Sequence, residues 1–249
     1  MRQPWGRMTP IGSPNDWANL LDSLIPEILA LVIATWEEMP HPAGDALEDP
    51  VSTAFCLRLR AGRNRWDLPF DIWTQLVELD PAAGEDQGRM DIVFKPMVPR
   101  EYIYFCLECK RLNVRTAIGV RPYSSEYVRF GMLRFVKGQY ANVVRHGGML
   151  AYVLDADVRA AIASVEGNIQ AQAAELGMDA QGTFLVSSIL PNDARVRETR
   201  HRRAANSDDP FVIQHLFMAG DPNAPLLPVA PAPPAAAGKK KTSRRKLQK

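Results

Sequence analysis

The chain has 249 residues and a formal net charge of +2; 46% of its residues are apolar and 23% are charged. This composition is typical of a globular protein and excludes collagen-like, coiled-coil and wholly disordered chains. Three cysteines are too few for a disulfide scaffold, the first residues lack a basic-then-apolar leader, and Pro26 and Glu27 interrupt the longest apolar stretch. We therefore expect a cytoplasmic protein without a membrane span.

Basic residues are concentrated at the C-terminal end. Seven of the thirty lysines and arginines lie in residues 239–249, and Asp221 is the only acid in residues 221–249. Residues 1–220 therefore carry 23 basic and 27 acidic residues, a net charge of −4. The body of the protein is expected to be mildly acidic, so the overall charge does not describe its surface.

A linker separates the body from the basic end. Residues 221–238 are rich in proline and alanine, which is typical of an extended, poorly ordered segment. We expect one domain over residues 1–220 and a disordered linker and basic tail over residues 221–249. The tail is either a solvated segment or a non-specific nucleic-acid contact that acts by releasing counterions. The tail residues assigned to that contact are Lys239, Lys240, Lys241, Arg244 and Arg245.

Two helices are predicted in the first quarter of the chain. Asn15 or Asp16 can cap a helix that runs towards Met39, because apolar residues recur there at helical spacing. Pro26 is expected to kink this helix or divide it in two. A second helical stretch is predicted near residues 48–61.

The apolar period then becomes strand-like. Three strands are predicted at residues 70–79, 89–94 and 102–110. A helix over 124–140, a buried strand over 149–154 and a long helix over 155–176 follow, and then three strand-like segments at 183–190, 196–202 and 211–218. This order predicts an α/β fold with a mixed central sheet flanked by helices.

Charged residues close the predicted strand over residues 102–110. Side chains two apart on a strand share a face, so Glu108 and Lys110 project together, and Asp91 approaches Glu108 if the two strands form a hairpin. Two carboxylates can bind a hard divalent cation, which polarises a phosphate and acidifies a bound water. The lysine can orient or deprotonate that water, or stabilise the charge that develops. The alternative is a surface ion pair, with Asp91 capping a turn.

Both motifs resemble those of a known family. Asp91 followed by Glu108-Cys109-Lys110 resembles the D…(D/E)xK signature of the PD-(D/E)xK, or restriction-endonuclease-like, nuclease superfamily. Gly88 to Ile92 resembles its GR-x-D-I form, with Met90 in place of proline. The resemblance implies a restriction-endonuclease-like core and an endonuclease that cleaves DNA with Mg²⁺, or with Mn²⁺ in its place. Asp91 and Glu108 would bind the metal, and Lys110 would assist the water.

The resemblance has further implications for residues and partners. Glu48 is the best match to an auxiliary carboxylate on the helix before the hairpin, with Glu37 and Glu38 as alternatives. Arg134 and Lys137 would contact phosphate if their shared helix face borders the pocket, and are otherwise surface charges. Restriction or anti-phage defence would imply a helicase or ATPase subunit as partner, or a homodimer. The alternative function is an inactive nuclease-fold subunit that binds nucleic acid or a partner protein.

Other reactive residues have simpler interpretations. Cys106 and Cys109 lie on opposite strand faces without a second ligand pair, so we expect buried small hydrophobes rather than zinc ligands. The segment Glu198 to Arg203 is basic and strand-like. It either follows a phosphate backbone or forms a solvated sheet edge, and we favour the edge.

Overall fold

A computed structural model describes residues 13–79, 81–85, 87–98, 100–178, 182–203 and 206–223. The expected basic tail, with Lys239, Lys240, Lys241, Arg244 and Arg245, lies outside the described residues. The helices are α1 (Pro14–Glu38), α2 (Glu48–Trp66), α3 (Ser124–Tyr127), the π-helical turn η1 (Val128–Met132), α4 (Leu133–Val136) and α5 (Val158–Ala171). The strands are β1 (Phe70–Val77), β2 (Arg89–Pro96), β3 (Phe105–Leu112), β4 (Val114–Thr116), β5 (Gly119–Arg121), β6 (His146–Val153), β7 (Leu185–Val186), β8 (Val196–Arg203) and β9 (Asn206–Ala219).

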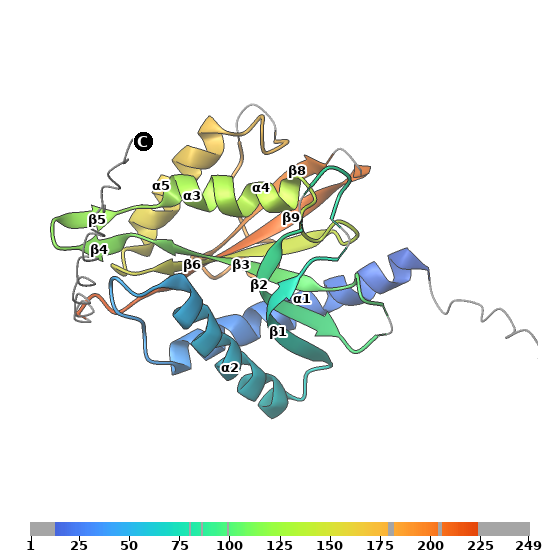
Figure 1. The fold of residues 1–249 in the computed structure, drawn as a ribbon, viewed down its shortest axis with the longest axis horizontal. Coiled ribbons are helices and arrows are strands. Elements are labelled where there is room, and N and C mark those ends of the chain that lie inside the picture. Colours follow the sequence, from blue (N-terminus) through green and yellow to red (C-terminus); the bar gives the residue numbers. More distant parts are fainter. Residues whose placement is uncertain are drawn as a thin grey trace, which may run out of the picture.

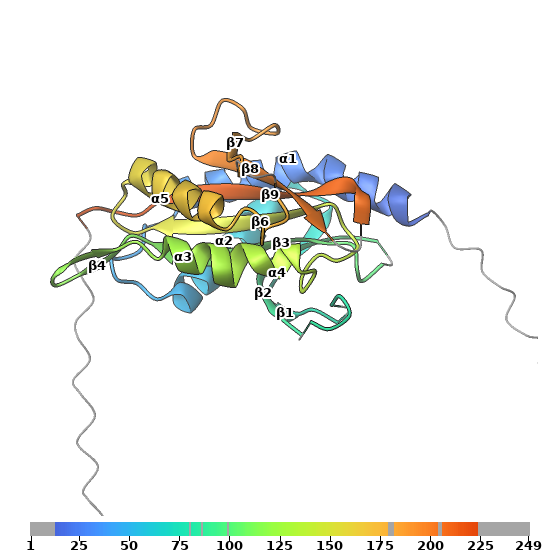
Figure 2. The ribbon, with the colours of Figure 1, turned by 90° about the horizontal axis from the view of Figure 1, so that it is seen from above.

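Within the described residues, seven strands form one mixed sheet in the order β1-β2-β3-β6-β9-β8-β7. The three central strands, β3, β6 and β9, are parallel, and their neighbours on both sides are antiparallel. Helices α1 and α2 cover one face of the sheet, and α3, α4 and α5 cover the other (Figures 1 and 2). The predicted α/β fold with a helix-flanked mixed sheet is confirmed. Strands β4 and β5 form a separate hairpin.

Helix α1 begins two to three residues earlier than its predicted caps. The Ser13 hydroxyl accepts a hydrogen bond from the Asp16 N–H, and the Asp16 carboxylate accepts one from the Ser13 N–H. Pro14 follows at the first helical position, where no N–H donor is needed. The helix continues through Pro26 to Glu38, so the expected division does not occur. Burial of an apolar stripe on both sides of Pro26 offsets the lost backbone hydrogen bond.

Helix α1 is long and apolar by the standards of this chain. It is the one helix among the described residues that meets the length and composition of a membrane span, with a mean hydropathy of 1.6 over its most apolar 18-residue window. Leu21, Ile28 and Val32 on this helix are fully buried within the fold. The core helix of a soluble protein meets the same requirement, so composition alone does not decide the environment of α1.

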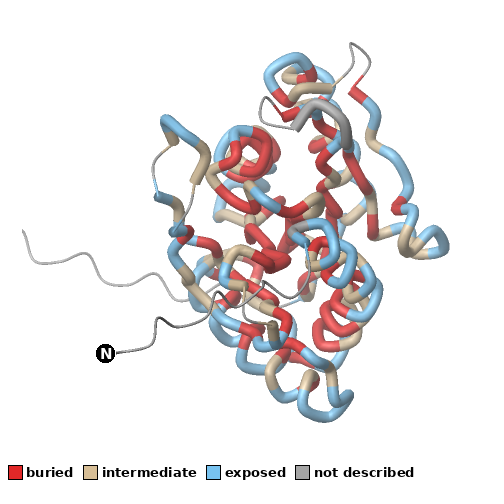
Figure 3. The backbone as a smooth tube through the Cα atoms, turned by 90° about the vertical axis from the view of Figure 1, so that its right-hand side faces the viewer, coloured by how far each residue is buried: buried red, intermediate tan, exposed pale blue. Residues whose placement is uncertain are grey.

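Aromatic packing anchors α1 and α2 to the sheet. The Trp36 ring stacks on Tyr152 of β6 at a centroid distance of 5.3 Å and meets the edge of Phe55 of α2 at 5.5 Å. The Trp36 indole N–H also donates to the Ala219 carbonyl at 2.8 Å. The buried segments run through the centre of the molecule (Figure 3). This packing fixes the first residue of α2, Glu48, beside β3.

Several predicted elements are shorter than expected. The helix over 124–140 is divided into α3, η1 and α4, and the helix over 155–176 ends as α5 at Ala171. The strand over 183–190 is reduced to the two residues of β7. The β4–β5 hairpin was not predicted, because its turn consists of Ala117 and Ile118, which are not typical turn residues.

Candidate active site

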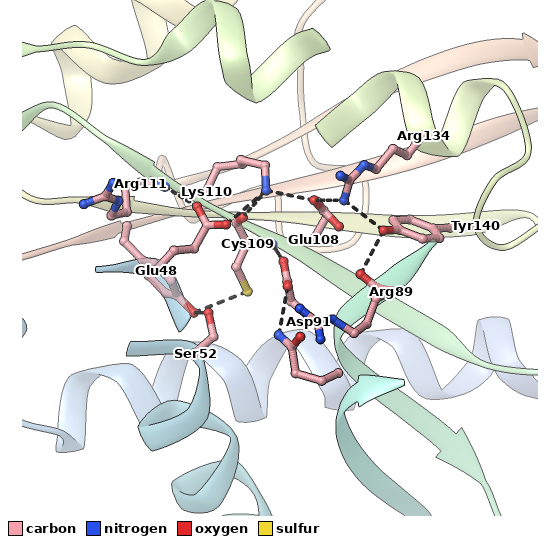
Figure 4. Close-up of polar contacts among 12 residues, drawn as sticks. Glu48, Ser52, Arg89, Asp91, Glu108, Cys109, Lys110, Arg111, Arg134 and Tyr140 are labelled. Atoms are coloured by element: carbon pink, nitrogen blue, oxygen red, sulfur yellow. Dashed lines mark hydrogen bonds and ion pairs between the residues drawn. The ribbon is translucent and has the colours of Figure 1, made fainter. Parts of the chain in front are cut away.

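The candidate site lies where β2 and β3 separate. Their paired register ends at Ile92 opposite Leu107, and continuing it would place Asp91 opposite Glu108. Beyond that pair, the Asp91 carboxylate accepts a hydrogen bond from the Cys109 backbone N–H at 2.7 Å. This contact replaces the next rung of the ladder and brings Asp91 and Glu108 to one point (Figure 4).

Glu108 is the most buried acid of the site, with 1% of its side chain exposed. Its Oε1 atom accepts hydrogen bonds from Lys110 Nζ and Arg134 Nη1, both at 2.8 Å. Its Oε2 atom is buried and has no hydrogen-bond partner among the described residues. A buried carboxylate oxygen without a donor is costly. The protein therefore satisfies Oε1 and leaves Oε2 as a position for a further ligand.

Lys110 and Glu48 form the second half of the cluster. Lys110 Nζ contacts Glu108 Oε1, Glu48 Oε1 at 3.1 Å and the Cys109 carbonyl at 2.8 Å. The second oxygen of Glu48 accepts the Arg111 N–H at 3.2 Å. Both Glu48 oxygens are therefore engaged by β3, which makes Glu48 a positioning residue for Lys110. The alternatives, Glu37 and Glu38, pair elsewhere, with Arg195 and Arg65.

Burial sets the electrostatics of the acids and the lysine in opposite ways. Burial raises the pKa of Asp91 and raises that of Glu108 to about 7, against the opposing effect of Lys110. Burial alone would lower the pKa of Lys110, but the neighbouring Glu108 and Glu48 carboxylates outweigh it and raise this pKa above its ordinary value. Lys110 therefore remains an ammonium, which favours charge stabilisation or water orientation over proton abstraction among the predicted roles.

Tyr140 packs against Gly88 and positions the residues of the site. The Tyr140 hydroxyl donates to the Arg89 carbonyl and accepts from Arg134 Nη1, each at 2.9 Å. A Cβ atom at Gly88 would lie 2.3 Å from the Tyr140 ring, so only glycine fits there. The glycine of the Gly88 to Ile92 motif thus makes room for the residue that holds Arg134. Sequence analysis assigned no role to Tyr140, because only the fold brings this residue to Gly88.

The π-helical turn η1 aims Arg134 at Glu108. A Cβ atom at Gly131 of this turn would lie 2.3 Å from the Met149 side chain and 3.7 Å from Glu108 Cγ, so the helix backbone approaches the sheet closely. Lys137, expected on the same face, is exposed where α4 ends and lines a surface hollow with Gly138 and Arg202. Arg134 reaches Glu108 while Lys137 is exposed where α4 ends at Val136, so the surface-charge alternative applies to Lys137.

Gln75 is a site residue that sequence reasoning missed. It lies opposite Asp91 in the β1–β2 register, at a position where the strand pairing skips from Thr74 to Leu76. Its φ of 57° is left-handed, which is unusual inside a strand for a residue other than glycine. Its amide lies 3.4 Å from Asp91 Oδ1. Asp71 and Thr74 in β1 are also polar, so polarity alone did not single out Gln75 in the sequence.

The donor set of the site suits a hard cation. Glu108 Oε2 has no partner in the described part of the chain, and Asp91 Oδ1 meets only the distant Gln75 amide. No group of three or more His, Cys, Asp and Glu side chains able to hold a metal occurs among the described residues. Mg²⁺ is commonly bound by one or two carboxylates and retained waters. Two carboxylates therefore fit Mg²⁺, whereas a structural zinc site would need four protein ligands.

Known proteins supply no family for this chain. No protein-family model, no curated protein and no solved structure matches it. The resemblance of the two motifs to the nuclease superfamily stays a prediction, and the function is inferred from the chemistry of the site.

Proposed function

We propose that this protein is a Mg²⁺-dependent endonuclease that hydrolyses phosphodiester bonds in DNA, with the site of a PD-(D/E)xK nuclease. The observation that supports this most is the buried Glu108 Oε2 atom near the Asp91 carboxylate and the Lys110 ammonium: no donor in the described part of the chain reaches it. A divalent cation would satisfy that oxygen and remove the cost of two neighbouring buried acids. A surface ion pair, the simpler interpretation, does not explain a 1% exposed Glu108.

Each residue of the cluster has a distinct role in the proposed reaction. Asp91 and Glu108 would hold Mg²⁺, which when bound polarises the scissile phosphate and acidifies a water. Lys110, held by Glu48, would orient the attacking water and stabilise the negative charge that develops on the phosphate. Arg134, held by Tyr140, fixes the Glu108 carboxylate through Oε1 and leaves Oε2 for the cation.

The proposal is tested by cleavage of supercoiled plasmid by the purified protein with Mg²⁺ or Mn²⁺. We expect nicking or linearisation that EDTA and Glu108→Gln both abolish. The matched control is Glu38→Gln, which removes a surface carboxylate paired with Arg65 and should leave cleavage unchanged. Cleavage that persists in Glu108→Gln, or the absence of cleavage by the wild type under every metal condition, contradicts the proposal.

A binding subunit without turnover is the second candidate. It is favoured by one observation: Lys110 and Arg134 together already neutralise Glu108 through Oε1. Titration of Mn²⁺ followed by electron paramagnetic resonance separates the two candidates. Binding that is lost in Asp91→Asn supports the nuclease, whereas DNA binding without any Mn²⁺ affinity supports the binding subunit.

A further inference from the structure

The β4–β5 hairpin is a projecting, basic element that has no role in the site described above. It follows β3 directly, separated from it by Asn113, and extends beyond the sheet (Figures 1 and 2). The segment from Arg111 to Tyr123 contains three arginines and no acid, although the body of the protein is mildly acidic. This local excess of positive charge sets the hairpin apart from its surroundings.

The hairpin has a rigid base and an apolar tip. The guanidinium of Arg121 lies 4.6 Å from the ring centroid of Tyr123, and that of Arg111 lies 5.9 Å from it. Arg115 donates from its backbone N–H to the Gly44 carbonyl at 2.8 Å. The tip residue Ile118 is 98% exposed, and Val120 is 51% exposed. The base is therefore held in place, while the tip reaches into solvent.

We propose that the β4–β5 hairpin is a DNA-binding arm whose tip enters the major groove of duplex DNA beside the site. A two-stranded ribbon fits the major groove of B-form DNA, which is about 12 Å wide. The positive charge of the arginines at the base is complementary to the negative charge of DNA phosphates. An exposed isoleucine suits apolar contact with thymine methyl groups in that groove. The major groove of A-form RNA is too narrow for such an arm.

The position of the arm allows it to share one duplex with the proposed active site, and the inference rests on the proposed function in this respect. Ile118 follows Lys110 by eight residues, so the tip is at most roughly 27 Å from the lysine along the chain. That distance is shorter than one helical turn of duplex, about 34 Å. One bound duplex can therefore contact both elements.

The described part of the chain ends beside the base of the hairpin. Arg115 Nη1 donates to the Pro222 carbonyl at 2.8 Å, and Asn223 is the last described residue. This contact is a further anchor for the base of the hairpin.

Equilibrium binding of the full chain in EDTA tests the arm without any cleavage. Fluorescence anisotropy would be measured with labelled duplex DNA of about two helical turns, with duplex RNA of the same sequence and with the single DNA strand. The test variants are Arg121→Ala and Ile118→Ser. Their matched controls on α2 are Arg58→Ala and Leu57→Ser, which remove an exposed arginine and a leucine that is 60% exposed.

We expect each test variant to weaken duplex DNA binding about 5- to 10-fold, with both controls within about twofold of wild type. Arg121→Ala should also lower the slope of log affinity against log salt by about one. Duplex RNA and single-stranded DNA should bind more weakly than duplex DNA.

Three results would overturn the arm: no duplex binding by the wild type, test variants that bind like their controls, or RNA bound as tightly as DNA. The outcome is separable from that of the nuclease. Plasmid cleavage with an ineffective Arg121→Ala removes the arm alone, whereas hairpin-dependent binding without cleavage removes the nuclease alone.

Discussion

Lys110 carries a positive charge that its surroundings both oppose and maintain. Burial disfavours the ammonium, and the Glu108 and Glu48 carboxylates restore it. The side chain is only 14% exposed, so this charge acts in a medium where screening by water is weak. An ammonium in that position strengthens any interaction with a phosphate that enters the site.

Removing this ammonium should stop catalysis and spare binding. Lys110→Ala is expected to lower the cleavage rate at least about 100-fold, because it removes a fixed charge aimed at the reacting group. Duplex DNA affinity in EDTA should stay within about twofold of wild type, because most affinity comes from other phosphate contacts. Single-turnover cleavage and anisotropy measure the two effects. Lys137→Ala is the control for an exposed lysine, and cleavage by Lys110→Ala at the wild-type rate would remove the assigned role.

At the scale of elements, three segments distant in sequence meet at Tyr140. The turn before β2 supplies Gly88, the end of the helical segment α3–η1–α4 supplies Arg134, and the chain after it supplies Tyr140. The Tyr140 hydroxyl then bonds to the Arg89 carbonyl at the start of β2. The strand that carries Asp91 is thus linked to the helical segment that holds Glu108.

Gly88→Ala should loosen this junction. Its Cβ would lie 2.3 Å from the Tyr140 ring, so the ring must shift and its contacts with Arg134 and Arg89 weaken. We expect a loss of about 1–3 kcal/mol in the free energy of unfolding, measured by urea titration, together with slower cleavage. Gly167→Ala on α5 is the control: nothing lies within 4 Å of its Cβ, so stability should rise by up to about 1 kcal/mol. Equal stability of the two variants would contradict the packing described.

At the scale of the whole molecule, a buried hydrogen-bonded chain connects the helical layer to β8 and β9. Tyr127 donates to His215 Nδ1 at 2.9 Å, and His215 Nε2 and His201 Nε2 both contact the Thr199 hydroxyl, at 2.8 and 2.7 Å. His201 Nδ1 donates to the Leu176 carbonyl at 2.8 Å. Every ring nitrogen is satisfied when both histidines are neutral, in opposite tautomers. Protonation of either ring would break one of these bonds.

The two buried histidines of this hydrogen-bonded chain are expected to make the free energy of unfolding depend on pH. Burial lowers the pKa of His201 to about 4 and that of His215 well below its ordinary value. At these two rings the unfolded chain therefore binds protons before the folded one does. Their contribution to stability is complete above about pH 6.5 and is lost as the pH drops towards 4. His201 alone should contribute about 3 kcal/mol of this loss. Glu108, whose pKa is raised to about 7, contributes in the opposite direction over this range.

Urea unfolding at pH 7 and pH 5 measures the effect. His201→Gln should lose less stability than wild type between these pH values, because one of the two titrating rings is gone. His41→Gln, at an exposed histidine, should lose as much as wild type. An equal loss in wild type and His201→Gln would contradict the role of the buried ring.

The burial of the segment Glu198 to Arg203 could not be predicted from its sequence. Its basic, strand-like sequence favoured a solvated edge. Strand β7 pairs with β8 only at Arg197 and Glu198, yet Glu198 and His201 are both buried. Glu198 accepts from the Ser188 backbone and hydroxyl, and Gln214 lies 3.3 Å away. The identity of a charged residue in the sequence does not reveal whether water or another residue of the fold is its hydrogen-bond partner. The pattern therefore could not distinguish an edge from an interior strand.

The sequence by itself determined the features that depend on local spacing. Alternation predicted β3 with Glu108 and Lys110 on one face, and the change of period predicted the helix-flanked sheet. The tertiary structure alone decided that Glu48 holds Lys110, that Arg134 leaves Glu108 Oε2 without a donor, and that Gly88 makes room for Tyr140. These contacts join residues from different elements, so they follow from how the elements pack and not from the spacing within any one of them.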